Sequence, residues 1–339
     1  MTRMAFVFPG QGSQAVGMGR DLGEASPRWA EANRAVGFDL QRLVFEGPEA
    51  DLALTANTQP AILTASIVAL DALTAAGVRC DLVAGHSLGE YSALVAAGAL
   101  DFADAVRTVR ARGQFMQEAV PAGEGAMAAI LGLDRALVAQ ACDEATDLGP
   151  VQLANLNGPG QTVIAGATSA VKKATDLAKA KGARRAVLLP VSAPFHSALL
   201  KPAAARLGTV LGDIRFRDLA VPLVTNVDAD LLTEGARVLD TLVRQVTAPV
   251  RWEDVVLRLA QEGVTTCVGP DPEPRLPLWP PAPLTFRRVF IEVRSSLVIG
   301  VATVGGRPMP MRVNSMLPVQ TSPTTSGKRL RAQTLPFSV

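Results

Sequence analysis

Imidazole and thiol groups are scarce in this sequence. Its 339 residues include two histidines and three cysteines. Cys80, Cys142 and Cys267 are odd in number and far apart, so they predict neither a disulfide framework nor a metal site. If the chemistry of the protein needs an imidazole base, only His86 and His196 are candidates.

Strong charge and long apolar runs are also missing, and we expect no leader sequence. The formal net charge is +2, which gives no reason to expect a nucleic-acid partner. No run of about 18 apolar residues occurs, so we expect no membrane span. The first residues lack the pattern of a signal peptide, and we therefore expect a cytoplasmic protein. We also expect no metal and no bound cofactor.

Small aliphatic residues dominate what is present. Hydrophobic residues make up 48% of the chain, but aromatic residues only 4%. A chain of this length can bury one large α/β domain, alone or carrying a smaller one. We expect a strand at 4–8, a helix at 27–36, and a helix that begins at Pro60 and ends at Gly77.

The turn Gly85-His86-Ser87-Leu88-Gly89 is the first candidate for chemistry. It follows the short apolar strand 82–84 and feeds a helix that runs through Ala97. Glycines at both ends allow a strained turn that lifts Ser87 clear of the sheet, and the helix directs its N-terminal amides toward the same place. The simpler alternative is an ordinary strand–helix turn with a serine cap. The context favours Ser87 as a nucleophile.

His196, in Pro194-Phe195-His196-Ser197, is the better candidate for the base. His86 adjoins Ser87 in sequence, and in such a turn the neighbouring side chain points elsewhere. No Asp or Glu occupies an obvious third position, so a backbone carbonyl is expected to orient the imidazole. A Ser-His dyad suits a reactive thioester better than an amide.

The segment from 124 to 190 has the alternation of a small α+β domain. The order of its expected elements is β-α-β-β-α-β, the ferredoxin-like pattern. These elements are strands at 126–131, 151–156, 162–165 and 185–189, and helices at 134–145 and 168–181. We predict that this domain is inserted into an α/β core formed by residues 1–123 and 191–266.

Composition changes after residue 266. Seven prolines fall between residues 270 and 283, and the stretch from 306 is rich in Pro, Ser, Thr and Arg. We expect residues 267–339 to form an atypical tail, irregular or disordered from residue 306, with a strand or two between Phe286 and Val301. We hypothesise a reading-frame change near residue 266, or an unusual extension. Resequencing the coding DNA tests the reading-frame change, because an intact alternative frame that encodes another ending would support it and the absence of such a frame would contradict it.

Six motifs occur in an order that resembles malonyl-CoA:acyl carrier protein transacylases, the acyltransferases of bacterial fatty-acid synthesis. They are FPGQGSQ (8–14), GHSLGEYSALVAAG (85–98), RGQFMQEAVP (112–121), NLNGPGQTVIAG (155–166), VSAPFHSALL (191–200) and QVTAPVRW (245–252). The resemblance covers residues 4 to about 266. It implies a hydrolase-like parallel-sheet α/β domain with an inserted ferredoxin-like α+β domain, and a site between the two.

The resemblance also implies roles for the catalytic residues. Ser87 matches the serine that is acylated, and His196 matches its base. Gln11 and the backbone amide of Leu88 match the oxyanion hole. Gln245 matches the residue whose backbone carbonyl orients the histidine. The partners implied are malonyl-CoA, as substrate, and acyl carrier protein, and we expect a monomer.

Three further residues match positions near the substrate. Arg112 matches the arginine that pairs with the malonyl carboxylate, and a guanidinium can bind a carboxylate through two parallel hydrogen bonds. Taken alone, Arg112 would be a solvated helix charge. Asn157 lies in the matching glycine-rich loop and is a candidate for contact with the substrate. The resemblance places Phe195 beside the acyl group, although taken alone it would be a core residue.

Three rival interpretations remain open. A serine thioesterase or other hydrolase shares Ser87 and His196 but does not account for Arg112. A dinucleotide-binding protein is suggested by Gly10-x-Gly12 and Ala15 after a strand, although the expected second strand is missing because 27–36 is helical. The third is an inactive product with a damaged C-terminus.

Overall fold

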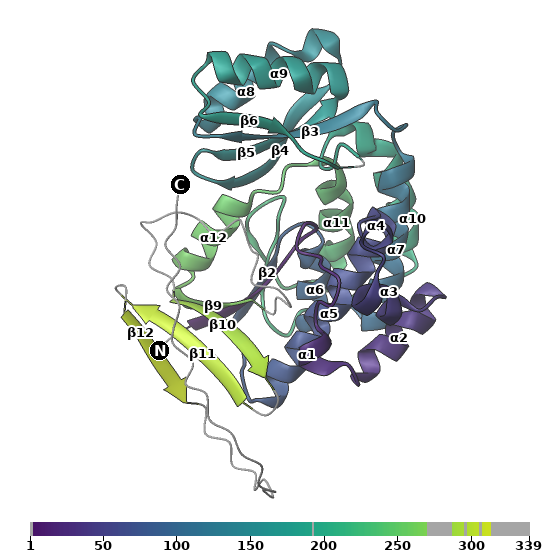
Figure 1. Ribbon diagram of the computed structural model, residues 1–339, viewed down its shortest axis with the longest axis vertical. Helices are drawn as coiled ribbons and strands as arrows, with labels where there is room; N and C mark the ends of the chain where they lie inside the picture. The colour runs from purple at the N-terminus through teal and green to yellow at the C-terminus, as the bar shows by residue number, and fades with distance from the viewer. Residues whose placement is uncertain (1–2, 192, 270–286, 295–296, 305–306, 313–339) are drawn as a thin grey trace, which may run out of the picture.

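The computed structural model describes residues 3–191, 193–269, 287–294, 297–304 and 307–312, and it contains two sheets (Figure 1). The larger sheet has eight strands in the order β12-β11-β10-β9-β1-β2-β7-β8. Its central strands are parallel, since β1 pairs with β2 and β9, and β2 pairs with β7. The smaller sheet has four strands in the order β4-β5-β3-β6.

Helices pack on both faces of the larger sheet. Its first five strands along the chain are β1 (Arg3–Phe8), β2 (Leu82–Gly85), β7 (Leu223–Val224), β8 (Leu231–Leu232) and β9 (Val264–Val268), of which β8 lies at one edge and pairs antiparallel with β7. The helices are α1 (Arg20–Gly23), α2 (Pro27–Val36), α3 (Leu40–Glu46), α4 (Glu49–Leu52), α5 (Thr55–Ala75), α6 (Gly89–Ala96), α7 (Phe102–Glu118), α10 (Lys201–Gly212), α11 (Val238–Thr247) and α12 (Trp252–Gln261). Short 3₁₀ turns occur at Ala198–Leu200 and Gly235–Arg237, and a third, Thr146–Leu148, belongs to the part of the chain that forms the smaller sheet.

The side chains of β1 alternate between two apolar layers, as the pleat of a strand requires. Phe6 and Phe8 join the core beneath α5, α6 and α7. Ala5 and Val7 join the core beneath α12, which contains Trp252. The apolar run predicted as a buried strand is therefore covered on both faces, as is usual for parallel sheets.

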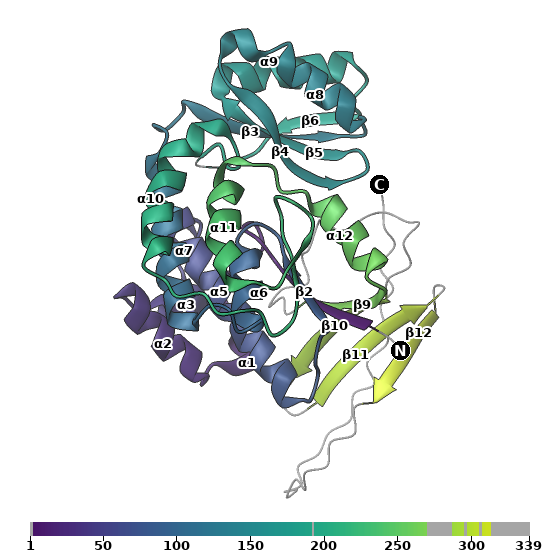
Figure 2. The ribbon, with the colours of Figure 1, turned by 180° about the vertical axis from the view of Figure 1, so that it is seen from behind.

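The smaller sheet carries two helices on its outer face (Figures 1 and 2). It comprises β3 (Gly125–Leu131), α8 (Arg135–Asp143), β4 (Val151–Gly158), β5 (Gln161–Ala167), α9 (Thr168–Ala180) and β6 (Arg185–Leu188). All of its pairings are antiparallel. The predicted ferredoxin-like pattern is confirmed, with element ends within two residues of those expected.

The prediction that a helix begins at Pro60 is wrong. Helix α5 begins at Thr55, and Pro60 lies inside it. Proline removes one helical hydrogen bond, but the start of this helix has other stabilising contacts. The hydroxyl of Thr58 donates to the carbonyl oxygen of Leu52 at 2.6 Å, and the amide of Asn57 donates to Asp51.

Helix α5 is the one helix in the described residues long and apolar enough to cross a membrane. It has 21 residues, and 78% of its apolar window is buried inside the protein. It contacts α7, α6 and α2, so its composition is that of a central core helix.

The larger sheet extends beyond the boundary expected at residue 266. Strand β9 continues to Val268, and Cys267 and Val268 pair with Ala5 and Phe6. Three further strands follow, β10 (Arg287–Arg294), β11 (Leu297–Val304) and β12 (Arg307–Arg312). The proline-rich stretch at 270–283 and the end of the tail, 313–339, lie outside the described residues.

The expectation of irregular structure from residue 306 is wrong for β12. This strand pairs antiparallel with β11 and carries Pro308 and Pro310. It lies at the edge of the sheet, where a residue without an N–H group is tolerated. The prolines there suggested an irregular chain, but they are compatible with an edge strand.

Candidate active site

Ser87 lies on a tight turn between β2 and α6. Its φ of 51° is in the left-handed region, which costs a non-glycine residue about 1 kcal/mol or more. The flanking glycines allow the turn because the neighbouring backbone lies too close to leave room for a side chain at either position. A Cβ on Gly85 would lie 2.0 Å from the carbonyl group of Gly89, and a Cβ on Gly89 would lie 2.3 Å from the carbonyl oxygen of Phe8. The strand, turn and helix predicted around Ser87 are all present.

The structure brings His196 to Ser87. The Oγ atom of Ser87 lies 2.8 Å from Nε2 of His196, and Nδ1 of His196 lies 2.8 Å from the carbonyl oxygen of Gln245. A carbonyl can only accept, so Nδ1 carries the proton and Nε2 accepts from the serine hydroxyl. In residues 3–191 and 193–269, no carboxylate hydrogen-bonds to this imidazole. The geometry is that of a dyad oriented by the backbone.

Two effects keep the imidazole of His196 neutral. Burial, followed by the positive charge of Arg112, lowers the pKa of His196 to about 3. At neutral pH the serine hydroxyl therefore faces an unprotonated ring, which is the form that a general base requires.

Arg112, from α7, is buried beside the nucleophile with a relative exposure of 2%. Its guanidinium donates to Oγ of Ser87 at 3.0 Å, to Oε1 of Gln245 at 3.0 Å and to Oε1 of Gln59 at 2.9 Å. All three acceptors are neutral, and Nε of Arg112 has no hydrogen-bond partner in the described part of the chain. A buried guanidinium with only neutral partners offers a strong site for a carboxylate.

Asn226 is a residue of the site that sequence reasoning missed. Its Oδ1 accepts from the backbone amide of Ser87 at 2.6 Å, and its Nδ2 donates to the carbonyl oxygen of Gly85 at 2.7 Å. One carboxamide therefore holds both sides of the strained turn. Asn226 is 139 residues from Ser87 in sequence, and no motif pointed to it.

Glu90, on the first turn of α6, was also missed. Its Oε2 accepts from Nε2 of Gln245 at 2.7 Å and from the amide of Asn226 at 3.2 Å, while its buried Oε1 has no hydrogen-bond partner among the described residues. Burial raises the pKa of Glu90 to about 7. A signal was available, because Glu90 lies three residues after Ser87 and so one helical turn beyond it.

His86 contacts other groups than the nucleophile. Its Nε2 hydrogen-bonds to Oδ1 of Asn157 at 3.1 Å, and its ring packs edge-on against Trp252. Burial lowers the pKa of His86 to about 4. Asn157, at the end of β4, therefore joins the smaller sheet to the nucleophile turn.

The remaining predicted residues are Leu88, Gln11 and Phe195, and their described contacts are with other groups. Leu88 directly precedes α6. Gln11 lies in the loop after β1, and its Nε2 donates to Oγ1 of Thr55 at 3.2 Å. Phe195 is half-buried and packs against apolar clusters of both the larger and the smaller sheet.

The loop after β1 does not have the geometry of a dinucleotide site. In that fingerprint a helix opens at the glycine-rich turn and points its amides at the pyrophosphate. Here the segment from Gly10 to Gly19 contains no helix, and α1 begins only at Arg20. The dinucleotide interpretation is therefore wrong.

This chain is similar to known acyltransferases. The acyl transferase domain family matches residues 5–276. The malonyl CoA-acyl carrier protein transacylase of Bacillus subtilis is 53% identical over 273 residues, covering 79% of this chain and 86% of the relative. The Escherichia coli K12 protein of the same name is 52% identical over 269 residues, covering 78% and 87%.

Solved structures give the same relationship. An acyl carrier protein S-malonyltransferase from Vibrio cholerae is 44% identical with a TM-score of 0.81, covering 86% of this chain and 97% of that one. A malonyl transacylase in complex with its type II polyketide acyl carrier protein is 46% identical with a TM-score of 0.78, covering 80% and 90%. This chain belongs to the family of malonyl-CoA:acyl carrier protein transacylases.

Proposed function

We propose that this enzyme transfers the malonyl group of malonyl-CoA to the phosphopantetheine thiol of acyl carrier protein, through a malonyl ester of Ser87. The names of the relatives at 52–53% identity support the reaction, and the solved complex of a related transacylase supports the partner. As the family resemblance implies, the reaction serves fatty-acid synthesis. The enzyme works as a cytoplasmic monomer without a bound cofactor.

The position of Arg112 is the observation that carries this proposal. Its guanidinium is buried, charged and hydrogen-bonded to Oγ of Ser87 at 3.0 Å. A malonyl group bound for attack has its free carboxylate within reach of this cation. An acetyl group has no such carboxylate and would leave the arginine without an anionic partner.

In the first half-reaction, Oγ of Ser87 attacks the thioester carbonyl carbon while Nε2 of His196 takes the hydroxyl proton. The carbonyl oxygen becomes an oxyanion. The backbone amide of Leu88, at the start of α6, stabilises this oxyanion together with Gln11. The C–S bond then breaks, and the imidazolium returns its proton to the sulfur of coenzyme A. Asn157 and Phe195 contact the substrate.

In the second half-reaction, the thiol of phosphopantetheine replaces coenzyme A. His196 takes the thiol proton as the sulfur attacks the ester of Ser87. Collapse of the second oxyanion breaks the C–O bond, and the same proton goes to Oγ. Because His196 acts in both directions, loss of this base slows both steps.

We further propose that residues 1–123 and 191–266, together with the end of β9 at Val268, form the acyltransferase core and that 124–190 form a separate small domain. The two independent sheets support this division. Residues 267–339 are an atypical ending, and a reading-frame change near residue 266 remains our hypothesis for it. The family match ends at residue 276.

Intact-mass measurement tests the function directly. Incubation with malonyl-CoA is expected to add one malonyl group to the wild-type enzyme and none to Ser87→Ala. Addition of the pantetheinylated carrier protein should then move the malonyl group to the carrier. Rapid release of free malonate with and without carrier protein would instead identify a thioesterase, and an unmodified wild-type enzyme would identify an inactive product.

A further inference from the structure

Gln152, on β4 of the smaller sheet, contacts the loop that carries His196. Its Nε2 donates to the carbonyl oxygen of His196 at 3.2 Å and to that of Thr247 at 3.1 Å. Its Oε1 accepts from the backbone amide of Ala198 at 3.0 Å. Two carbonyl partners on one atom and one N–H partner on the other define the orientation of the carboxamide.

Through these three hydrogen bonds, Gln152 contacts both of the segments that supply the hydrogen bond orienting the base. His196 lies on one side, with Nδ1 2.8 Å from the carbonyl oxygen of Gln245 on the other. Thr247 is the last residue of α11, two residues after Gln245. The carboxamide of Gln152 therefore joins the loop that holds the imidazole to the end of the helix that holds its acceptor.

The loop needs such support because His196 is held in a strained conformation. Its φ is 59°, one of only three positive values at non-glycine residues in the described chain. Ser87 is another, and a single carboxamide, that of Asn226, holds the backbone on both sides of it. Strained residues persist only where surrounding contacts hold them.

Resting on the proposed function, we infer that Gln152 is a positioning residue for the general base, acting across the boundary between the two sheets. It fixes the distance between His196 and the carbonyl of Gln245, and thereby the tautomer that leaves Nε2 free to accept a proton. It touches neither Ser87 nor Arg112, so its effect belongs to proton transfer and not to recognition of the malonyl carboxylate.

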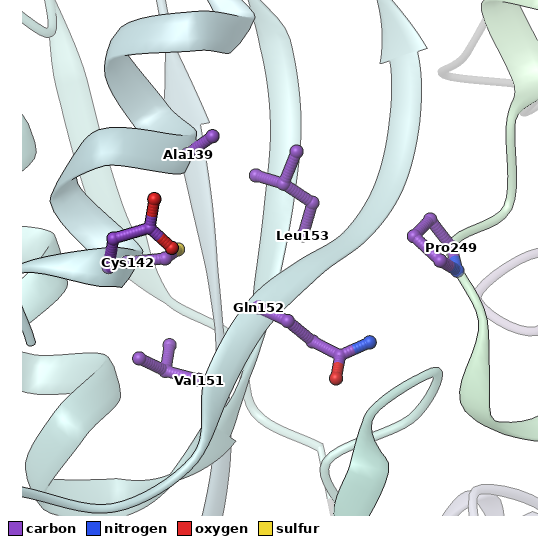
Figure 3. Close-up of a pocket in the computed structure, with 7 residues that line it drawn as sticks. Ala139, Cys142, Val151, Gln152, Leu153 and Pro249 are labelled. Carbon is purple, nitrogen blue, oxygen red and sulfur yellow. The ribbon is translucent and has the colours of Figure 1, made fainter. Parts of the chain in front are cut away.

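The surroundings of Gln152 agree with this role. Its side chain extends from β4 toward Pro249, away from Cys142 on α8 (Figure 3). Pro249 belongs to the segment after α11, and the adjacent Val250 exchanges backbone hydrogen bonds with Ala154 and Leu156 of β4. The backbone thus anchors β4 to this segment independently, and the side chain of Gln152 can be replaced without separating the two.

Gln152→Met is the main test, because methionine keeps the length of the side chain and removes all three hydrogen bonds. We expect single-turnover malonylation of Ser87 at saturating malonyl-CoA to slow about 10-fold, with the KM and the preference for malonyl over acetyl within about twofold of wild type. Gln152→Ala is the second variant if methionine prevents folding. Gln140→Met, on the exposed face of α8, is the matched control and is expected to leave the rate unchanged.

Nitrogen-15 NMR of the histidine rings separates positioning from general damage. The chain has only two histidines, so His86 serves as an internal reference. Wild-type His196 is expected to show the Nδ1–H tautomer, and Gln152→Met should populate the other tautomer while His86 is unchanged. An unchanged rate, or a slower rate with an unchanged His196 ring, overturns the inference. A wild-type enzyme that malonyl-CoA does not acylate overturns the proposed function instead.

Discussion

At the scale of single residues, the hydroxyl group of Ser87 takes part in two hydrogen bonds with different roles. Its hydroxyl donates to Nε2 of His196 and accepts from the guanidinium of Arg112. In the role that we propose for Arg112, a malonyl carboxylate competes with Oγ for the N–H group of the guanidinium. We therefore expect the malonyl substrate to release a lone pair of the nucleophile, and an uncharged acyl group not to do so.

Arg112→Ala is expected to lower kcat/KM for malonyl-CoA by about 100-fold or more, because it removes the cationic partner of a buried carboxylate. Reaction with acetyl-CoA should change by less than about 10-fold. Arg107→Ala is the control, since its exposed guanidinium pairs with Asp104 on the same helix. Competition between malonyl-CoA and acetyl-CoA, followed by intact mass, measures the preference. An unchanged preference in Arg112→Ala would contradict the carboxylate role.

At the scale of elements, the nucleophile turn is stable because three segments meet on it. The glycines of the turn allow β1, β2 and α6 to approach closely. Asn226 arrives from the segment after β7 and satisfies the backbone groups that the turn leaves open. The strained backbone conformation of Ser87 is thus stabilised by a residue from another part of the chain.

Asn226→Ala is expected to lower the free energy of unfolding by about 2 to 4 kcal/mol, because two buried backbone groups lose their partners. Malonylation of Ser87 should slow as the turn relaxes. Urea denaturation and intact-mass kinetics measure the two effects. Asn33→Ala, which removes an amide on the periphery of α2, is expected to cost about 1 kcal/mol or less. Equal losses in the two variants would contradict a special role for the turn.

At the scale of the whole molecule, a carboxyl group is buried where the core meets the active site. Glu90 is fully buried, and the pKa of its folded form is raised from 4.5 to about 7. A raised pKa in the folded state means that folding favours the protonated form. The stabilisation is complete below about pH 4.5 and is lost as the pH rises through 7.

Glu90→Gln removes this titration. Relative to wild type, the variant should gain about 2 to 3 kcal/mol of unfolding free energy between pH 5 and pH 8, from the difference between the pKa values of the folded and unfolded states. Urea unfolding at several pH values measures the difference. Parallel stability curves for the two proteins would show that Glu90 titrates normally. Glu46→Gln, on the exposed end of α3, is a control for the loss of one carboxylate.

Much of this molecule could be predicted from local sequence. The smaller sheet was predicted element by element, because its strands and helices follow the period of their apolar residues and end at glycine turns. Ser87 could be identified from its flanking glycines, and His196 from the scarcity of imidazoles. The start of α5 could not be predicted, because Pro60 suggested that the helix begins there. Hydrogen bonds from the side chains of Thr58 and Asn57 instead stabilise an earlier start.

Local sequence was enough to predict the nucleophile, the candidate bases, the small α+β unit and the family, because each of these depends on short-range pattern or on ordered motifs. The distant groups that complete the site could be found only once the chain was folded. Three such groups are the side chains of Asn226, Glu90 and Gln152. Each forms a hydrogen bond with a residue that lies far away in sequence. A hydrogen bond requires contact within about 3 Å, and local patterns carry no information on which remote side chain meets that condition.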